Sequence, residues 1–299
     1  MFLTEFLSDN QTFINVLVCY ALVAFSIQVA LRAGCFSLAG VGFYGIASYG
    51  AAIMVKAGVP AVVAIAITVA SCAVVGWLFA LILVRLKDLY LGLATVAFVL
   101  MVSVVAVNWT SVTGGASGLY AIPASVSPLA MVLLLVGVIV LLALLERGTI
   151  GRTFEATRED EQLAMVMGID PRRYRRFAFA LSAALGGLSG ALHALTFFAI
   201  SPTDAGFPFI VLALAMVIIG GFGSWMGALI GALIIAWLPL QLAFLGQWWP
   251  VIYGATMIVI ATYLPGGLHA LVKRALARRR SKQDPPVESS AELVGATSA

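Results

Sequence analysis

Residues 151–176 read GRTFEATREDEQLAMVMGIDPRRYRR and separate two long stretches without a charged side chain, 129–145 (LAMVLLLVGVIVLLALL) and 177–200 (FAFALSAALGGLSGALHALTFFAI). The segment between them holds six Arg and five acidic residues. Apolar runs of about 20 residues are long enough to cross the hydrocarbon core of a bilayer as helices. The pattern therefore predicts two membrane spans joined by a polar segment that lies in water.

The composition extends this pattern to the whole chain. Of the 299 residues, 62% are hydrophobic and 10% are charged, and the mean hydropathy is +1.08. Soluble domains contain about 45–50% apolar and 25% charged residues, so this chain exceeds what a water-soluble fold can bury. The net charge of +4 is no indication of nucleic-acid binding. The thiols of Cys19, Cys35 and Cys72 lie in or beside apolar segments, where we expect them to be buried and unreactive.

Seven more apolar stretches join the two already quoted. The candidate spans are 13–31, 36–55, 60–84, 91–107, 129–145, 177–200, 207–221, 226–245 and 249–264. We therefore expect an all-α, polytopic integral membrane protein with about 8–10 transmembrane helices, nine if every stretch crosses fully. Glycines interrupt the second stretch and the seventh is short, so broken or re-entrant helices are expected at these two places.

The positions of Lys and Arg predict the orientation, because cytoplasmic loops are enriched in both. With the N-terminus outside and the C-terminus in the cytoplasm, every one of the 17 basic residues except Lys56 falls inside. The acidic residues that fall outside are Glu5, Asp9 and Asp204. This asymmetry favours an odd number of crossings.

Two parts of the chain follow from this orientation. Residues 1–272 are expected to form the membrane domain, with 146–176 as its cytoplasmic loop. Residues 273–299 are expected to form a cytoplasmic tail that is basic at first. The rest of this tail is rich in Pro, Ser and acidic residues and has no apolar run, which predicts disorder.

The nine candidate spans contain no Asp, Glu, Lys or Arg. Ion-driven carriers and pumps place such groups in the membrane, although each costs about 2.5–3.5 kcal/mol on insertion scales. His193 is the one candidate for titration at depth, and a lone helical His is more typical of a packed residue than of a proton relay. No catalytic, metal-binding or nucleotide-binding motif is present. We expect no enzyme activity and no cofactor, so uphill transport would need energy from a partner.

A glycine-rich segment, 34–50, interrupts the second span. So many glycines in one helix favour close backbone approach or a helix break. Two tyrosines add hydroxyl groups and ring faces there, which suits a path for a partly polar, partly apolar solute. The residues assigned to this translocation path are Gly42, Tyr44, Gly45, Tyr49 and Thr95. Helix packing alone is the alternative interpretation.

Two further glycine motifs lie elsewhere. Gly223, Gly227 and Gly231 recur every four residues, a spacing that favours close helix packing, and the preceding pair of glycines is a possible hinge. Between the fourth and fifth spans, an uncharged turn-forming loop contains Thr113, Gly114 and Gly115. It is either an ordinary connection or part of an external gate.

The charged segment has the pattern of a short amphipathic helix. Apolar Phe154, Leu163, Val166 and Met167 alternate with charged residues, and the i,i+3 pairs Arg152–Glu155 and Glu155–Arg158 would support the helix. Gly168 is well placed to end it, and Pro171 bars its continuation. Such a helix either rests on lipid or docks into a protein. Because lipid-bound helices favour Lys and Arg, the mixed charges favour a protein groove.

Five ordered motifs resemble those of permease subunits from branched-chain amino-acid ABC importers. They are SLAGVGFYGIASYGAA (37–52), YLGLATVAF (90–98), TGGASGL (113–119), GRTFEATREDEQLAMVMGID with RRFAFALSAALGGLSGAL (151–170 and 175–192), and GGFGSWMGALIGAL (220–233). The resemblance extends over about residues 15–265. The YLGLAT and TGG motifs are most similar to the LivM-like type of subunit. Ala47 stands where the family often has Gly, and Asp160 where Asn is common.

The resemblance implies a heteromeric importer in the bacterial inner membrane. It would contain two related permeases, two cytoplasmic ATPases that bind the ATP, and an external solute-binding protein that delivers branched-chain or related amino acids. By the same resemblance, a coupling helix would bind the ATPase through Gly151, Arg152, Glu155, Ala156, Arg158, Glu159, Glu161 and Gly168. Since the spans carry no charge, backbone dipoles, hydroxyls and water would contact the charged groups of the solute.

Two other functions are consistent with the same sequence. One is a stand-alone channel or facilitator for small solutes that works without ATPase partners. The other is a membrane scaffold that conducts no solute. The exact solute is also open, because related members of the family transport other amino acids, short amides, urea or aromatic acids.

Overall fold

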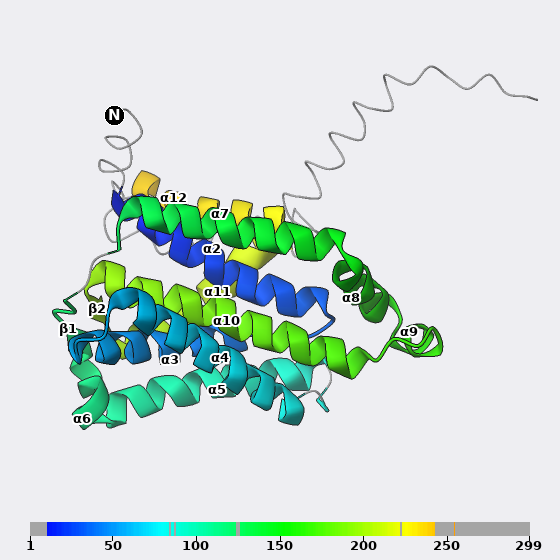
Figure 1. Cartoon of the computed structure of the whole chain (residues 1–299), viewed down its shortest axis with the longest axis horizontal. Helices are drawn as coiled ribbons and strands as arrows, with labels where there is room; N and C mark the ends of the chain where they lie inside the picture. The colour runs from blue at the N-terminus through cyan, green and yellow to red at the C-terminus, as the bar shows by residue number, and fades with distance from the viewer. Residues whose placement is uncertain are drawn as a thin grey trace, which may run out of the picture.

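The computed structural model describes residues 11–83, 85–86, 88–123, 126–221, 223–242 and 254, over which the chain forms a helical bundle (Figure 1). The longer helices are α2 (Gln11–Arg32), α3 (Ala39–Lys56), α4 (Ala61–Leu83), α5 (Asp88–Asn108), α7 (Pro128–Arg147), α10 (Pro171–Phe197), α11 (Phe207–Gly220) and α12 (Trp225–Leu242). The shorter elements are α6 (Thr110–Thr113), η1 (Gly115–Ser117), β1 (Leu119–Tyr120), α8 (Thr149–Glu159), α9 (Glu161–Val166), β2 (Ala199–Ile200) and η2 (Pro202–Ala205). The expected all-α class is confirmed.

Five of the described helices are long and apolar enough to cross a membrane, namely α2, α4, α5, α7 and α10. The apolar helix α11 and the apolar part of α12 are shorter. The chain is therefore a multi-pass membrane protein, as its composition predicts. Nine crossings remain a prediction, because the stretch 249–264 and the end of 226–245 lie outside the described residues, as does the tail 273–299.

The glycine-rich segment forms α3 only from Ala39 onward. Residues 35–38 are not helical, and they join α2 to α3. The Leu38 N–H at the start of α3 donates to Thr95 Oγ1 of α5 over 3.1 Å. Away from water, a backbone N–H outside a helix needs such a partner. The hydroxyl of Thr95 therefore supports the point where the helix begins.

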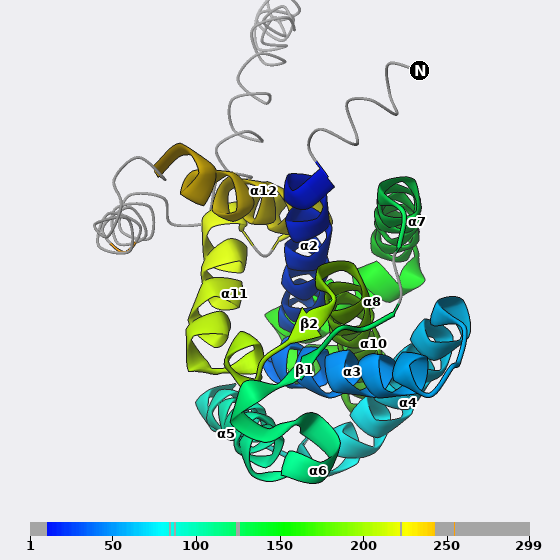
Figure 2. The ribbon, with the colours of Figure 1, turned by 90° about the vertical axis from the view of Figure 1, so that its left-hand side faces the viewer.

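Helix α10 lies at the centre of the bundle and packs against α2, α3 and α4 (Figure 2). Small residues allow this packing. A Cβ atom added at Gly186 or Gly190 would overlap backbone atoms of α3, and Ser189 Oγ donates to the Cys19 carbonyl of α2 over 2.7 Å. The apolar stretches of α2 and α10 are each 72% buried, against 17% for α7. The inner pair thus forms the core, and the outer face of α7 is left for lipid or another subunit.

The two ends of the bundle carry different structures. At one end, β1 pairs with β2 in antiparallel register, Leu119 opposite Ile200, beside α6, η1 and η2. At the opposite end, α8 and α9 project beyond the long helices (Figure 1). The polar segment that the sequence singles out therefore lies at one end of the molecule, and the glycine loop lies at the other.

The polar segment contains two helices where the sequence predicted one. Asp160 separates α8 from α9, and its Oδ1 accepts hydrogen bonds from the backbone N–H groups of Gln162 (2.8 Å) and Leu163 (3.0 Å). An aspartate in this position caps a new helix, which the charge pattern did not reveal. Gly168, at φ +81°, follows α9. Pro171 is the first residue of α10, where a proline is favoured, so Arg172–Arg176 belong to α10.

Candidate functional site

Helix α8 is seated on the ends of α2 and α7. The side chain of Phe154 is only 6% exposed, and its ring meets that of Tyr174 edge-on at a centroid distance of 6.4 Å. Gly151 touches the last turn of α7 so closely that a Cβ atom there would overlap the backbone of Glu146. Glycine is therefore required at this first position of the charged motif, because a side chain there would collide with α7.

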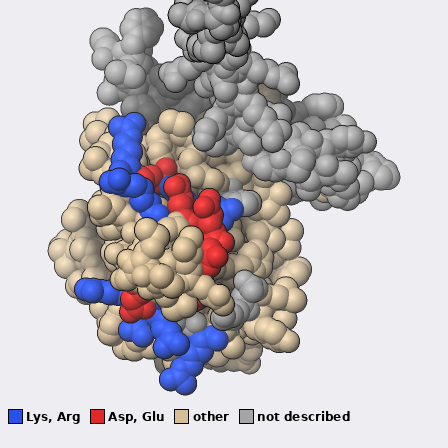
Figure 3. Space-filling model, turned by 90° about the vertical axis from the view of Figure 1, so that its right-hand side faces the viewer, with Lys and Arg blue, Asp and Glu red and all other residues tan. Residues whose placement is uncertain are grey.

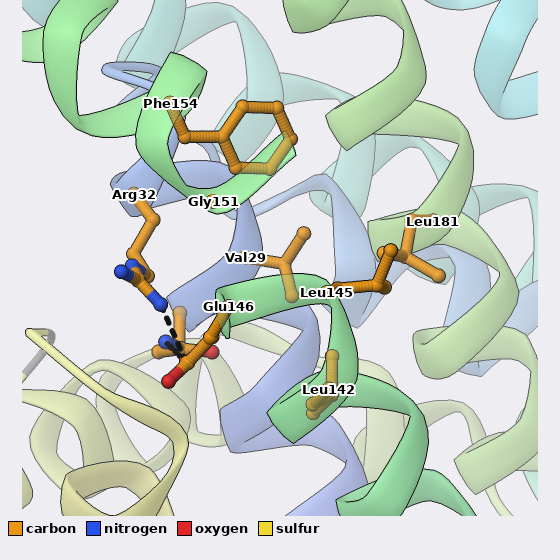
Figure 4. Close-up of a pocket in the computed structure, with 9 residues that line it drawn as sticks. Val29, Arg32, Leu142, Leu145, Glu146, Gly151, Phe154 and Leu181 are labelled. Carbon is orange, nitrogen blue, oxygen red and sulfur yellow. Dashed lines mark hydrogen bonds and ion pairs between the residues drawn. The ribbon is translucent and has the colours of Figure 1, made fainter. Parts of the chain in front are cut away.

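A buried arginine connects α8 to the bundle (Figure 4). Nη1 of Arg32, in the last turn of α2, lies 2.7 Å from Glu146 Oε1, and its Nη2 lies 2.6 Å from Glu155 Oε1. The exposed fractions of the side chains are 8% for Arg32, 19% for Glu146 and 60% for Glu155. The guanidinium thus pairs with one carboxylate inside the protein and another at its surface, a two-partner geometry that suits Arg better than Lys.

Glu146 connects three helices near their ends. Besides Arg32 of α2, its Oε1 accepts hydrogen bonds from Gln28 Nε2 (3.1 Å), also of α2, and from the backbone N–H of Trp225, the first residue of α12 (2.9 Å). Since Glu146 itself belongs to α7, one oxygen atom holds α2, α7 and α12 together. We call Gln28, Arg32, Glu146 and Glu155 the Arg32 cluster. A cavity of about 20 Å³ adjoins it, lined mainly by apolar side chains (Figure 4).

Helix α9 is attached to a different part of the bundle. Glu161, its first residue, accepts two hydrogen bonds from Arg175 of α10, Nη1 to Oε1 over 3.3 Å and Nη2 to Oε2 over 3.0 Å. Both side chains are largely buried. Two hydrogen bonds between the same side chains fix the orientation of the Arg175 guanidinium relative to the Glu161 carboxylate as well as the distance between them. The ion pairs of the two short helices thus lead to different helices, from α8 to α2 and from α9 to α10.

The outer surface of α9 is apolar although it projects from the bundle. The exposed fractions of its side chains are 58% for Leu163, 52% for Met165, 85% for Val166 and 71% for the adjacent Met167. We call these four residues the α9 tip. Exposed Arg152, Arg158 and Glu159 lie nearby on α8, and charged side chains gather on this end of the molecule (Figure 3). An apolar patch with a charged rim is typical of a protein-binding surface.

A large cleft opens beside α9. Its volume is about 1190 Å³, and residues from the end of α4, from α9 and from the first turns of α10 line it. The charges that line the cleft include Arg85, Asp170, Arg172 and Arg176. Of the eight predicted coupling residues, Glu159 and Glu161 line this cleft as well. Ala156 is half-buried in α8, whereas Gly168 is exposed after α9.

A second cavity lies toward the β1–β2 end. Its volume is about 260 Å³, and we call it the aromatic cavity. Its lining consists of Tyr20, Tyr44, His193, Thr203, Asp204, Pro208, Phe209 and Leu212. Tyr44 is 2% exposed, and its ring centroid lies 4.7 Å from that of Phe209 and 5.5 Å from that of His193.

Of the five residues predicted for the translocation path, Tyr44 lines this cavity. A Cβ atom at Gly42 would lie 2.5 Å from the Phe98 ring, so this glycine is explained by packing. A Cβ atom at Gly45 would lie 2.9 Å from Ala205 Cβ of η2. The glycines that suggested a path instead allow α5 and η2 to approach α3.

The other two predicted path residues are buried. Thr95 Oγ1 donates to the Gly92 carbonyl over 2.8 Å while accepting from Leu38, so its hydroxyl has a structural role. Tyr49 is 7% exposed, and its hydroxyl has no hydrogen-bond partner among the described residues. Thr95 therefore supports the wall of the bundle rather than lining the aromatic cavity.

The predicted external loop is an ordered structure. Thr113 Oγ1 lies 2.6 Å from the carbonyl oxygen of Ala106 and 2.7 Å from that of Trp109, which ties the loop to the end of α5. Gly114 and Gly115 adopt left-handed conformations, at φ +75° and +64°. These turns direct β1 onto β2. The loop therefore covers the segment that leads from α10 into η2.

The predicted glycine stripe contains two contact residues where three were expected. A Cβ atom at Gly227 would overlap the backbone at Gly221, and one at Gly231 would overlap the Met216 carbonyl of α11. Both glycines thus let α12 touch α11 backbone to backbone. Gly223 precedes α12, and a Cβ atom there would meet nothing within 4 Å. Its spacing matched the stripe, but it lies outside the helix.

Three important residues were not recognised from the sequence. Arg32 was counted only among the basic residues expected inside, and Glu146 only as the first residue of the predicted loop. Each lies in the last turn of an apolar helix, α2 or α7, and the two form an ion pair. Asp204 was named only for its predicted position outside, and the structure places it in the lining of the aromatic cavity. The sequence around Asp204, Ser-Pro-Thr-Asp, has the pattern of a capping box and so marks this aspartate as a structured residue. In the structure, the Ser201 N–H donates a hydrogen bond to Asp204 Oδ2 over 2.8 Å.

Comparison with known proteins agrees with this architecture. Residues 11–261 match the family described as "Branched-chain amino acid transport system / permease component". The high-affinity branched-chain amino acid transport system permease protein LivM of Escherichia coli (strain K12) is 27% identical over 238 aligned residues, covering 68% of this chain and 56% of LivM. The chain thus spans little more than half the length of this relative. No solved structure matches the chain.

Two other relatives differ in the transport named for them. The probable branched-chain amino acid transport permease protein LivH of Methanocaldococcus jannaschii is 38% identical over 110 residues, covering 37% of this chain and 33% of LivH. The autoinducer 2 import system permease protein LsrC of Yersinia enterocolitica is 26% identical over 163 residues, covering 52% of this chain and 45% of LsrC. The match over residues 11–261 is the decisive one. This chain belongs to the family of permease components of branched-chain amino acid transport systems.

Proposed function

We propose that this chain forms half of the translocation pathway of an ATP-driven importer, which moves branched-chain or related amino acids across the bacterial inner membrane. The observation that carries the proposal is the construction of α8 and α9. These helices expose an apolar tip to water, yet ion pairs anchor them to two central helices of the bundle. Such a segment suits transmission of force from a soluble partner to the spans.

The anchoring pairs define a route for that force. Movement of α8 would act on Arg32 and therefore on α2, and Glu146 would carry it to α7 and α12. Movement of α9 would act on α10 through Glu161 and Arg175. Helices α2 and α10 also contribute Tyr20 and His193 to the aromatic cavity. Displacing the two helices together would change access to this cavity, a shear or hinge motion of packed elements.

The proposed assembly contains this chain, a second homologous permease, two cytoplasmic ABC ATPases and an external solute-binding protein. ATP would be bound by the ATPases, and we propose no enzyme activity, cofactor, metal or nucleic acid for this chain. The N-terminus would lie outside and α8–α9 in the cytoplasm. The cluster of Arg residues around α8, α9 and the start of α10 supports this orientation.

The test is the complete importer reconstituted in proteoliposomes, with ATP-dependent uptake of radiolabelled L-leucine as the measurement. Val166→Glu places a charge on the α9 tip, where the side chain is 85% exposed and contributes little to folding. We expect loss of ATPase co-purification and a fall in uptake of about tenfold or more, because an unpaired charge in an interface is costly. Gln162→Glu, which adds the same charge to an exposed site on α9, is the matched control and should retain both.

Normal co-purification and uptake with Val166→Glu would contradict the docking role of the tip. The alternative, a facilitator without ATPases, predicts a different result. This chain alone in proteoliposomes would then equilibrate leucine without ATP.

A further inference from the structure

The aromatic cavity has a negative charge at one side. Asp204 belongs to η2, which enters the bundle between α3 and α5, since Ala205 lies against Gly45 and the Pro202 carbonyl accepts from Ser103 Oγ of α5 over 3.2 Å. The Asp204 carboxylate is held in place by the Ser201 N–H. No Lys or Arg occurs among the described residues that line the cavity. A cationic group entering from solution would therefore find a fixed carboxylate without a competing basic side chain.

Apart from Thr203, the remaining walls are apolar and aromatic. The Tyr44 ring contacts the rings of Phe209 and His193, and Tyr20 meets Phe209 at a centroid distance of 6.1 Å. Leu212 and Pro208 complete the surface. At about 260 Å³, the cavity is close to the lower end of the range for small-molecule sites, about 300–1,000 Å³. Such a surface favours a small solute with an aliphatic side chain over a large or highly polar one.

The imidazole ring of His193 belongs to the same wall, beside Tyr44. Its Nδ1 atom is buried, without a hydrogen-bond partner among the described residues, so this nitrogen does not face the open space of the cavity. His193 therefore contributes a ring surface to the wall, and Asp204 remains the charged group that a solute would meet.

We infer that the aromatic cavity is a solute subsite, in which Asp204 binds the ammonium group of an α-amino acid, and Tyr44 and Phe209 contact its side chain. This inference rests on the proposed function and deepens it by naming the groups that recognise the solute. It also revises the expectation that only backbone dipoles, hydroxyls and water contact the charged groups of the solute. The carboxylate comes from η2, a turn between the spans, which is why a search of the spans for charge could not find it.

The central test is Asp204→Asn in the complete importer. Asparagine keeps an oxygen that can accept from the Ser201 N–H, so η2 remains capped while the negative charge is lost. We expect ATP-dependent uptake of L-leucine to fall by about tenfold to a hundredfold, as for loss of a hydrogen bond to a charged group. ATP hydrolysis stimulated by the solute-binding protein should stay near the wild-type rate, because the ATPase contacts lie at the other end. Asp204→Glu should restore part of the uptake.

A second measurement tests recognition without transport. The purified importer, without its solute-binding protein, is unfolded thermally in the presence of L-leucine, 3-methylbutylamine or 4-methylpentanoate. The amine lacks the carboxylate of leucine, and the acid lacks its ammonium group. We expect leucine and the amine to raise the Tm of the wild-type protein and the acid to leave it unchanged. Asp204→Asn should abolish the effect of the amine.

The outcomes separate this inference from the proposed function. Wild-type uptake of leucine together with unchanged uptake by Asp204→Asn would overturn the subsite and leave the importer function standing. Equal stabilisation of the wild-type protein by the amine and the acid would also overturn the subsite, even if the variant failed to fold. Absence of ATP-dependent uptake by the wild-type importer would instead overturn the proposed function.

Discussion

The two ends of the bundle are held together by different kinds of contact. All three ion pairs between described residues lie at the α8–α9 end, where Arg32 and Arg175 join the short helices to α2 and α10. At the β1–β2 end, backbone hydrogen bonds, left-handed glycines and a self-capped turn close the structure. Both ends are closely packed, since Gly151 of α8 also touches backbone, but only the α8–α9 end adds charged pairs to that packing. The comparison indicates that charge holds the end that we propose docks a soluble partner.

The largest loss of stability is expected at the α8–α9 end. Arg32→Met leaves Glu146 largely buried without its cation, and removing one partner of a buried ion pair costs about 3–5 kcal/mol. The measurement is thermal or denaturant unfolding of the purified importer. Arg152→Met, on an exposed side chain of α8, is the control and should change stability by no more than about 0.5 kcal/mol. Equal stability of the two variants would show that the Arg32 cluster does not hold this end.

An intermediate loss of stability is expected at the β1–β2 end. Gly118 has φ +76°, and a Cβ atom there would overlap the Ile200 carbonyl of β2. Gly118→Ala should therefore push β1 away from β2 and lower stability by about 1–3 kcal/mol, as for a residue forced into a strained conformation. Thermal unfolding is again the measurement.

Gly137→Ala provides the matched control for that substitution. Gly137 lies within α7, and a Cβ atom there would meet nothing within 4 Å. Alanine should stabilise the helix by up to about 1 kcal/mol. If both alanine variants were equally stable, the close fit of the β1–β2 end would not depend on its glycine.

The smallest effect on stability is expected for Glu155→Gln. The Glu155 side chain is 60% exposed, and an exposed ion pair contributes about 0–1 kcal/mol. Leucine uptake per ATP hydrolysed should nevertheless fall, because α8 would lose its charged link to α2. Glu159→Gln, on the same helix, is the comparison for loss of one exposed charge. A normal ratio of uptake to hydrolysis in Glu155→Gln would show that force does not pass through Arg32.

The sequence predicted the all-α class, the apolar helices and the polar segment. Composition and the length of the apolar runs are enough for this, because they show which parts of the chain lie in lipid and which in water. Local pattern failed where tertiary contacts decide. Glu155, for which partners within its own helix were expected, also forms an ion pair with Arg32, 123 residues away in the chain. One amphipathic helix was predicted where the structure has two, because Asp160 caps α9.

The assignment of residues to a translocation path stays a prediction, and the glycines are weak evidence for it. A glycine that lines a pore and a glycine that admits a neighbouring helix look alike in sequence. Gly42 and Gly45 are of the second kind. Tyr44 differs from them, because its side chain lines the aromatic cavity. The local pattern at Asp204 indicates a helix cap, but it does not indicate that this turn folds back between α3 and α5 and so reaches the cavity.

The exposure of α7 has a consequence for the Arg32 cluster. Its 20 residues give a length of roughly 30 Å, which matches the hydrocarbon thickness of a bilayer. With little of its surface buried within the chain, α7 leaves its outer face to lipid or to another subunit. Glu146 lies in the last turn of α7, so a change in bilayer thickness that tilts or shifts this helix would act directly on the Arg32 cluster and, through Arg32, on α8.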